Sequence, residues 1–286
     1  SAALKEVSED FPTEKKSQTT TLLLSSNFLA SALTPVFIVG VIASIGWRHT
    51  FSWISLAGIL LLIIFLLLNK KQFTTKKAIK KPKIDWSHIN NRIWIFVIIG
   101  FFLSLIIKGL GTWMPIYFLT ERHLNLKSLA WLVPLPAISG GIAAMLSGFI
   151  MIHLFKKHER LMLVTFSILT AIFMFGLYKS TSLFWIVFFE VLTYFTKSLA
   201  FTGIYAFAAR IFDSKTYGSS IGVISFGSQL GSFCGPILIG WLINITGSYS
   251  AAFLGLVIAA LLAALTSLFA GNIQYDAQQT KEEALL

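Results

Sequence analysis

The sequence predicts an all-α polytopic membrane protein, and three observations support this fold class. The mean hydropathy is +0.77, and hydrophobic residues make up 56% of the 286 positions. Charged residues make up 12%, about half of the ~25% that is typical of soluble domains. The apolar residues fall into eight runs, each near the roughly 20 residues that cross a bilayer.

These runs give the order of the predicted helices. They lie at about residues 21–44, 51–68, 92–119, 127–154, 160–178, 182–211, 218–243 and 250–271. Pro134 and Pro136 are expected to bend the fourth run. A basic linker separates the first two helices from the other six. The expected organisation is the end of one helical half, a cytoplasmic linker, a six-helix half and a cytoplasmic tail, at 1–68, 69–91, 92–271 and 272–286.

Lysine and arginine are concentrated on one set of alternate loops. Seventeen of the 23 lie in the chain ends, the linker and the loops in phase with them. The four on the opposite side are Arg48, Arg122, Lys127 and Lys179. Because cytoplasmic loops carry an excess of Lys and Arg, we expect both chain ends in the cytoplasm and the protein in the plasma (inner) membrane. The net charge of +11 then reflects topology, and no nucleic-acid partner is expected. The linker either binds anionic membrane lipids or is a solvated topology determinant.

The most distinctive local pattern is a ladder of glycines in the 218–243 run. Gly227, Gly231 and Gly235 recur at every fourth residue and are followed at once by Pro236. Small residues at this spacing leave a smooth groove along one face of a helix, which predicts close approach of another helix. A second close-packing face is expected in the 127–154 run, at Gly140, Ala144 and Gly148.

The glycine-ladder segment has a weak copy near the start of the chain, at a constant offset in residue number. Pro35 matches Pro236 and Gly46 matches Gly247. Small residues replace the ladder glycines, in the form of Ser26, Ala30 and Thr34. Internal duplication is common in transporters. The offset therefore predicts a parent architecture of six plus six helices, of which this chain begins near the end of the first half, as a fragment.

Three short motifs resemble the major facilitator superfamily. Residues 11–15 (Phe-Pro-Thr-Glu-Lys) resemble its segment after the fourth helix, and residues 46–51 (Gly-Trp-Arg-His-Thr-Phe) its turn between the fifth and sixth. Residues 113–117 (Trp-Met-Pro-Ile-Tyr) are similar to the end of the seventh helix in the organic-anion, sugar-acid and organophosphate branches. The resemblance implies that the eight helices are equivalent to helices 5–12 of twelve. Ile152 stands where the family often has an aspartate, which removes the usual acid of that loop.

Three charged residues lie inside predicted spans, where charge is rare and usually functional. They are Lys108, Glu190 and Lys197. Lys108 and Glu190 are placed at similar depth, on helices that resemble the seventh and tenth, so we expect them to pair or nearly pair. Lys197 shares one helix face with Glu190 and Tyr194. It is then free to bind an anion, and the alternative is that it snorkels to the cytoplasmic interface.

Asn27 and Gln229 lie inside the two repeat-related helices. Each is expected either to hydrogen-bond substrate or to join helices, an interaction worth about 1 kcal/mol. The five histidines fall in loops or at helix ends, and Cys234 is the single cysteine. These residues give no catalytic set, metal cluster or phosphate loop, so we expect no enzyme activity, no cofactor and no metal.

The predicted function is secondary active transport of a small organic anion, such as a carboxylate, a sugar acid or a phosphate ester. The resemblance implies alternating access, with protons as a candidate coupling ion and a monomer when full length. Two lysines against one glutamate in the spans favour an anion. The alternatives are proton-driven efflux of lipophilic compounds, favoured if both lysines face lipid, and a non-transporting membrane sensor with a transporter fold.

Overall fold

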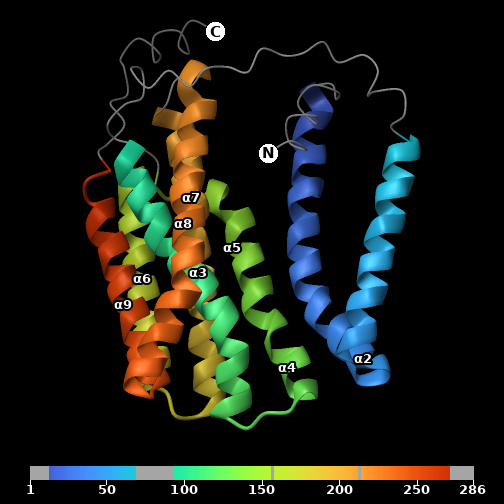
Figure 1. The fold of residues 1–286 in the computed structure, drawn as a ribbon. Helices are drawn as coiled ribbons and strands as arrows, with labels where there is room; N and C mark the ends of the chain where they lie inside the picture. The colour runs from blue at the N-terminus through green and yellow to red at the C-terminus, as the bar shows by residue number, and fades with distance from the viewer. Residues whose placement is uncertain (1–12, 69–92, 156–157, 212–213, 271–286) are drawn as a thin grey trace, which may run out of the picture.

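In the computed structural model, the described residues are 13–68, 93–155, 158–211 and 214–270. They form α-helices joined by short turns and contain no strand. In chain order the helices are α2 (Thr13–Leu68), α3 (Ile93–Thr120), α4 (Leu126–Leu132), α5 (Pro134–His153), α6 (Glu159–Lys179), α7 (Leu183–Ile211), α8 (Ser214–Thr246) and α9 (Tyr249–Ser267). Figure 1 shows α3 and α5–α9 as a bundle, with α2 beside it.

Seven segments of the described chain are long and apolar enough to cross a membrane, which confirms an all-α polytopic fold. They are Phe37–Leu67, Ile93–Thr120, Leu126–Met151, Glu159–Lys179, Leu183–Ala208, Ser219–Thr246 and Tyr249–Ser267. The first two of the eight predicted runs are both in α2. Most side chains in the first part of α2 lie outside the described residues. The first segment therefore begins at Phe37 and includes the end of the first predicted run together with nearly all of the second.

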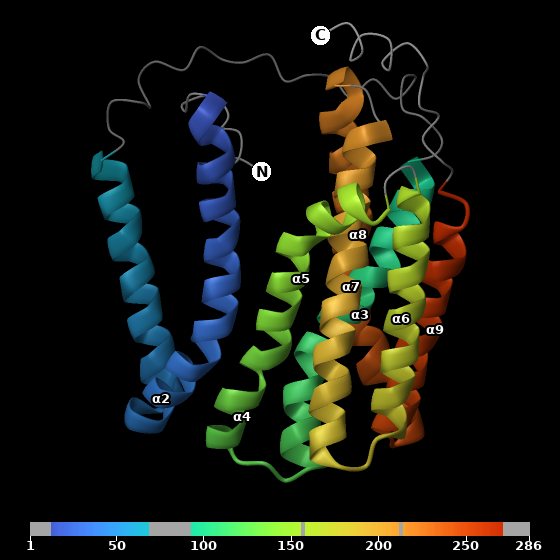
Figure 2. The ribbon, with the colours of Figure 1, turned by 180° about the vertical axis from the view of Figure 1, so that it is seen from behind.

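Helix α2 is a hairpin of two arms that meet at Gly46. This residue has φ 78° and ψ 160°, which no α-helix contains, and Figure 1 shows the chain reversing at this end of α2. The hydroxyl of Thr50 donates to the Gly46 carbonyl over 2.8 Å. The hairpin packs chiefly on α5 and α4, which lie between it and the rest of the bundle in Figure 2. Most of its large apolar side chains are exposed, as expected for a lipid-facing surface.

The glycine ladder of α8 packs directly on the backbone of α3, as the sequence predicts. A Cβ on Gly231 would overlap the carbonyl oxygen of Phe101, and one on Gly235 would lie 2.5 Å from that of Leu105. A Cβ on Gly227 would meet Val97 at 2.5 Å. The contacts step by four residues on both helices, so α3 and α8 run parallel in register. Only glycine permits this approach, which directs a Cα–H of each ladder glycine toward α3.

The second predicted close-packing face, on α5, is only partly right. Gly140 does pack closely, because a Cβ there would lie 2.9 Å from the Ser198 hydroxyl of α7. Gly148 has nothing within 4 Å, and it is exposed. The contact instead follows Ser139 and Ser147, whose hydroxyls donate to backbone carbonyls of α7 over 2.8 and 3.3 Å. The missing side chain of Gly140 and the hydroxyl donors of Ser139 and Ser147 together set this interface.

The predicted bend in the fourth run is a break between two helices. α4 ends at Leu132 and α5 begins at Pro134, with Val133 between them. Proline fits the first turn of a helix because its missing N–H has no partner to lose there. α4 itself begins at the Asn125 cap, whose side-chain oxygen accepts from the Ser128 N–H over 2.8 Å.

The motif at residues 113–117 joins three helices near one end of the bundle. The indole N–H of Trp113 donates to the Pro236 carbonyl of α8 over 2.9 Å. The ring of Tyr117 packs against Tyr249 and Phe253 of α9, with centroids 5.3 Å from each. The motif therefore stabilises the end of the bundle at which Gly247 connects α8 to α9, called the Gly247 end below. The Gly46 turn of α2 lies at the same end (Figure 1).

Candidate functional site

A cavity of about 290 Å³ opens between α3, α7 and α8. Polar side chains, two aromatic residues and one isoleucine line it: Ser104, Ile107, Lys108, Phe201, Tyr205, Ser225, Ser228, Gln229 and Ser232. The structure thus brings together Lys108 and Gln229, two of the residues predicted from the sequence. Both are exposed to this space rather than packed in the core.

Lys197 is the most buried of the three intramembrane charges. Its side chain is 2% exposed, and its ammonium nitrogen lies 3.6 Å from the centroid of the Tyr194 ring. This is a cation–π contact, which is strongest for desolvated ammonium groups. A lysine snorkelling to the interface would keep its ammonium group in water, so the structure does not support that alternative.

The charged residue that acts on Glu190 is Lys197, whereas the sequence predicted Lys108 as its partner. The charges that act on Lys197 are those of Glu190 and Lys108. Among the described residues, Lys108 and Glu190 form no ion pair, and the charge that acts on the Glu190 carboxyl group is that of Lys197. Glu190 is 5% exposed. The predicted ion pair is therefore not formed in the structure, and Lys197 is the charged residue that acts on Glu190.

The helix ends explain this correction. Lys108 lies about three turns before the end of α3 at Thr120, whereas Glu190 lies about two turns after the start of α7 at Leu183. At a rise of about 1.5 Å per residue, the two positions differ by about 7 Å in depth from the Gly247 end. Lys197, about four turns after Leu183, matches the depth of Lys108 more closely.

Three polar residues occupy the middle of their helices. Lys197 is the central residue of α7, and Gln229 and Lys108 lie close to the centres of α8 and α3. Polar side chains from three helices are thus placed at mid-height, the depth at which transporters bind substrates. Two lysines against one glutamate leave a positive balance, so this region can attract a small anion.

Tyr205 and Ser228 are site residues that the sequence interpretation missed. The Tyr205 hydroxyl lies 3.4 Å from that of Ser228, which in turn donates to the Ile224 carbonyl over 3.1 Å. A signal for both was present. Tyr205 follows Lys197 by eight residues, or about two helical turns, and so lies on the same face of α7. On α8, Ser225, Ser228 and Ser232 recur three and four residues apart on the face of Gln229.

Asn27 lies in the first arm of α2, in a part of the helix whose side chains are outside the described residues. Its predicted role stays a prediction.

The sequence profile of the Major Facilitator Superfamily matches residues 2–189 and 154–284, which together include almost the whole chain. The chain belongs to the Major Facilitator Superfamily. Membership of this superfamily confirms the resemblance drawn from the motifs and the helix pattern. It also agrees with the expectation that the protein is an integral membrane protein and not an enzyme.

Several known transporters are similar to this chain. The probable galactarate/D-glucarate transporter GudP of Escherichia coli is 23% identical over 90% of the chain and 65% of its own length. The hexuronate transporter of Bacillus subtilis is 28% identical over 80% of the chain and 60% of its own length. The probable sulfoacetate transporter SauU of Cupriavidus necator is 25% identical over 84% of the chain and 61% of its own length. The chain thus spans about 60–65% of the length of these relatives.

A solved structure of another protein has the same fold. A bacterial homolog of the human lysosomal transporter Spinster, in an inward-facing and occupied conformation, matches with a TM-score of 0.69. The match covers 94% of this chain and 72% of that protein at 14% identity, so it concerns the fold alone.

Proposed function

We propose that the chain is part of a secondary active transporter that moves a small organic anion by alternating access. The observation that carries this proposal is a cavity lined by Lys108 and Gln229 near the middle of α3 and α8, with the buried Lys197 at the middle of the adjoining helix α7. Lys108 and Gln229 line the cavity, and Lys197 lies within the electrostatic range of Lys108. In the proposed mechanism the anion binds at mid-height, and the two helical halves rock about it.

The proposed substrate class is a carboxylate, with sugar acids as the leading candidates and phosphate esters next. Lysine presents a compact point charge to a carboxylate or phosphate. The hydroxyls of Tyr205 and Ser228 and the amide of Gln229 supply hydrogen bonds of the kind that sugar hydroxyls need. The names of the relatives, which refer to galactarate, D-glucarate, hexuronates and sulfoacetate, support an organic anion.

The proposed orientation places both chain ends and the 69–91 linker in the cytoplasm, with the Gly247 end outside. The distribution of lysine and arginine supports it, because cytoplasmic loops attract these residues. We also propose that 1–68 closes the first helical half and that 92–271 forms the second. The protein is proposed to work as a monomer in the plasma membrane when full length.

Glu190 is the proposed site of proton coupling. It is a carboxyl group held inside a membrane-spanning helix, and its charge acts on Lys197. A change in the protonation of Glu190 changes the charge balance around Lys197, and with it the attraction for an anion. This gives a physical route by which protons and substrate are linked.

Counterflow uptake by the full-length protein tests the transport proposal. Proteoliposomes preloaded with unlabelled D-glucarate are expected to accumulate labelled D-glucarate, and Lys197→Ala is expected to abolish this accumulation. Lys127→Ala is the matched control, because Lys127 is an exposed lysine that does not line the cavity. Equal counterflow in the wild type and Lys197→Ala would contradict the assignment, and the assay is repeated with a hexuronate and with sulfoacetate.

Efflux of a lipophilic cation is less consistent with the site. That alternative is favoured when both lysines face lipid, yet Lys197 is buried and Lys108 lines the cavity. A lipophilic cation would meet two like charges there, which raises the electrostatic cost of binding.

A further inference from the structure

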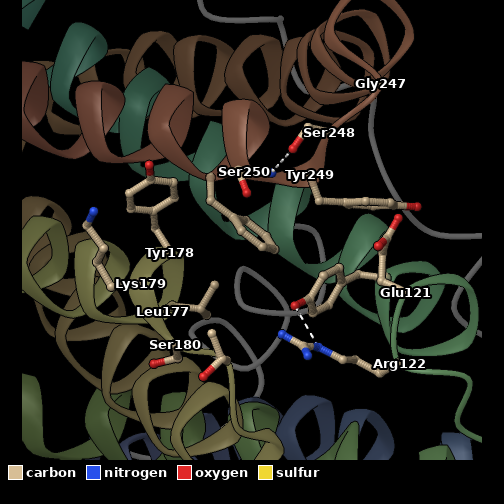
Figure 3. Close-up of a pocket in the computed structure, with 13 residues that line it drawn as sticks. Glu121, Arg122, Leu177, Tyr178, Lys179, Ser180, Gly247, Ser248, Tyr249 and Ser250 are labelled. Atoms are coloured by element: carbon tan, nitrogen blue, oxygen red, sulfur yellow. Dashed lines mark hydrogen bonds between the residues drawn. The ribbon is translucent and has the colours of Figure 1, made fainter.

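A second pocket, of about 300 Å³, lies at the Gly247 end of the bundle. It is formed where three connections meet: the end of α3, the turn between α6 and α7, and the turn between α8 and α9. Figure 3 shows the side chains that these segments direct toward it. The pocket is lined by the basic residues Arg122 and Lys179, by the acidic residue Glu121 and by hydroxyl groups of serine, threonine and tyrosine.

Arg122 offers the clearest binding group in this pocket. Its Nε donates to the Tyr117 hydroxyl over 2.9 Å, and its guanidinium carbon lies 5.5 Å from the Tyr117 ring centroid. Within the described chain, its two terminal nitrogens have no hydrogen-bond partner. In Figure 3 the guanidinium points toward the middle of the pocket, and the carboxylate of Glu121, which also lines the pocket, lies on the side of Tyr249. Arg122 is therefore held in place by Tyr117 with its terminal N–H donors available.

Two further features add positive potential. The ammonium of Lys179 lies at the rim, 5.1 Å from the Tyr178 ring centroid. The N-terminus of the 19-residue helix α9 also lines the pocket, where the Ser248 hydroxyl caps the helix by accepting from the Ser250 N–H over 3.1 Å. A helix N-terminus carries about half a positive charge. Lys179, the N-terminus of α9 and Arg122 all line the same pocket and contribute positive potential to it.

The scarcity of basic residues at this end makes their convergence informative. Arg48, Arg122, Lys127 and Lys179 are the basic residues of the loops on this side, and two of the four line this single pocket. Outer loops have no topological need for such residues. A pair brought together from two separate connections of the chain therefore indicates a binding role.

We propose that this outer pocket binds the carboxylate group of a small organic anion through Arg122, as a receiving site separate from the cavity at Lys108. Guanidinium groups bind carboxylates in a bidentate manner, which suits the free terminal nitrogens of Arg122. A positive pocket at the mouth raises the local concentration of an anion. The anion class and the outward orientation rest on the proposed function, whereas the pocket itself does not.

Hydrogen–deuterium exchange on the purified chain in nanodiscs, with and without D-glucarate, reports on each site separately. We expect slower exchange of amides at 119–125 and 247–251 when D-glucarate is present. Arg122→Gln is expected to weaken the apparent affinity at these segments about tenfold or more, the effect of losing one charge-assisted interaction. Arg122→Lys, which keeps the charge, is expected to restore part of it.

Two control variants make the outcomes distinguishable. Lys127→Gln removes an exposed charge from the same end without touching the pocket and is expected to have no effect. Lys108→Gln is expected to remove protection around 225–232 while leaving the outer segments protected. If the outer segments are unprotected, or stay protected in Arg122→Gln, the outer pocket is not an anion site. If only the 225–232 segment is unprotected in the wild type, the proposed central site fails instead.

Discussion

Gly46 and Gly247, which the internal offset in the sequence matches to each other, are the two glycines of the described chain with positive φ angles, 78° and 65°. Each reverses the chain between two consecutive spans at the same end of the molecule (Figure 1). The offset therefore pairs two residues with the same unusual sign of φ. This agreement supports the proposal that the α2 hairpin and the α8–α9 pair descend from one duplicated unit.

Substitution of either turn glycine should destabilise the protein. Gly46→Ala and Gly247→Ala place a Cβ on a residue with positive φ, at a cost of about 1–2 kcal/mol each. Gly58→Ala is the matched control, because Gly58 lies within a helix with nothing within 4 Å of its Cβ position. That control should be neutral or stabilising by up to about 1 kcal/mol. Unfolding in detergent measures all three, and equal effects would contradict the turn assignment.

The glycine ladder gives a second test of the fold. Gly231→Ala places a methyl group on the Phe101 carbonyl, so α3 and α8 must separate. Overpacking of this kind costs about 1–3 kcal/mol. Gly222→Ala, on the same helix with no atom within 4 Å, is the control and should leave the midpoint of thermal unfolding unchanged or raise it. A Gly231→Ala protein as stable as the wild type would contradict the close approach.

The fold was more predictable from the sequence than the site, for physical reasons. Apolar run length, prolines inside a run and glycines at every fourth residue act locally, so they predicted the spans, a bend near Pro134 and a close helix contact. They did not predict that the bend is a break at Val133 or that the partner helix is α3. Pairing of Lys108 with Glu190 depended on helix ends that hydropathy fixes only to within a turn. The α5 face was only partly predicted because two sets of small residues lie one position apart on this helix. The Ser139 and Ser147 hydroxyls, which donate to α7, place their own set in the contact.

Tyr194 should matter to stability through its ring. Tyr194→Phe keeps the aromatic face under the Lys197 ammonium, whereas Tyr194→Leu removes it. A desolvated cation–π contact is worth about 2 kcal/mol, so the leucine variant should lose about that much more stability than the phenylalanine variant. Chemical unfolding in detergent compares the two. Equal losses in both would show that the hydroxyl, and not the ring, is what matters.

Glu190 should control the response of transport to pH. Glu190→Gln cannot change its charge, so the full-length variant should take up anion at a rate that no longer depends on a proton gradient. Glu159→Gln is the comparison, since Glu159 is also buried but lies at the start of α6, away from the cavity. Uptake in proteoliposomes with and without a pH difference is the measurement. Unaltered pH dependence in Glu190→Gln would count against proton coupling at this residue.

Equilibrium binding of D-glucarate to the purified chain tests the central claim most directly, because α3, α7 and α8 are all present in it. In the Arg122→Gln background, which removes the proposed outer site, Lys108→Gln and Lys197→Gln should each weaken binding about tenfold or more, while Lys127→Gln should bind like the Arg122→Gln protein. Calorimetry with D-glucarate, a hexuronate and sulfoacetate gives the affinities. Binding that is unchanged by both lysine substitutions, or no binding of any of the three anions, would contradict an anion site at the middle of these helices.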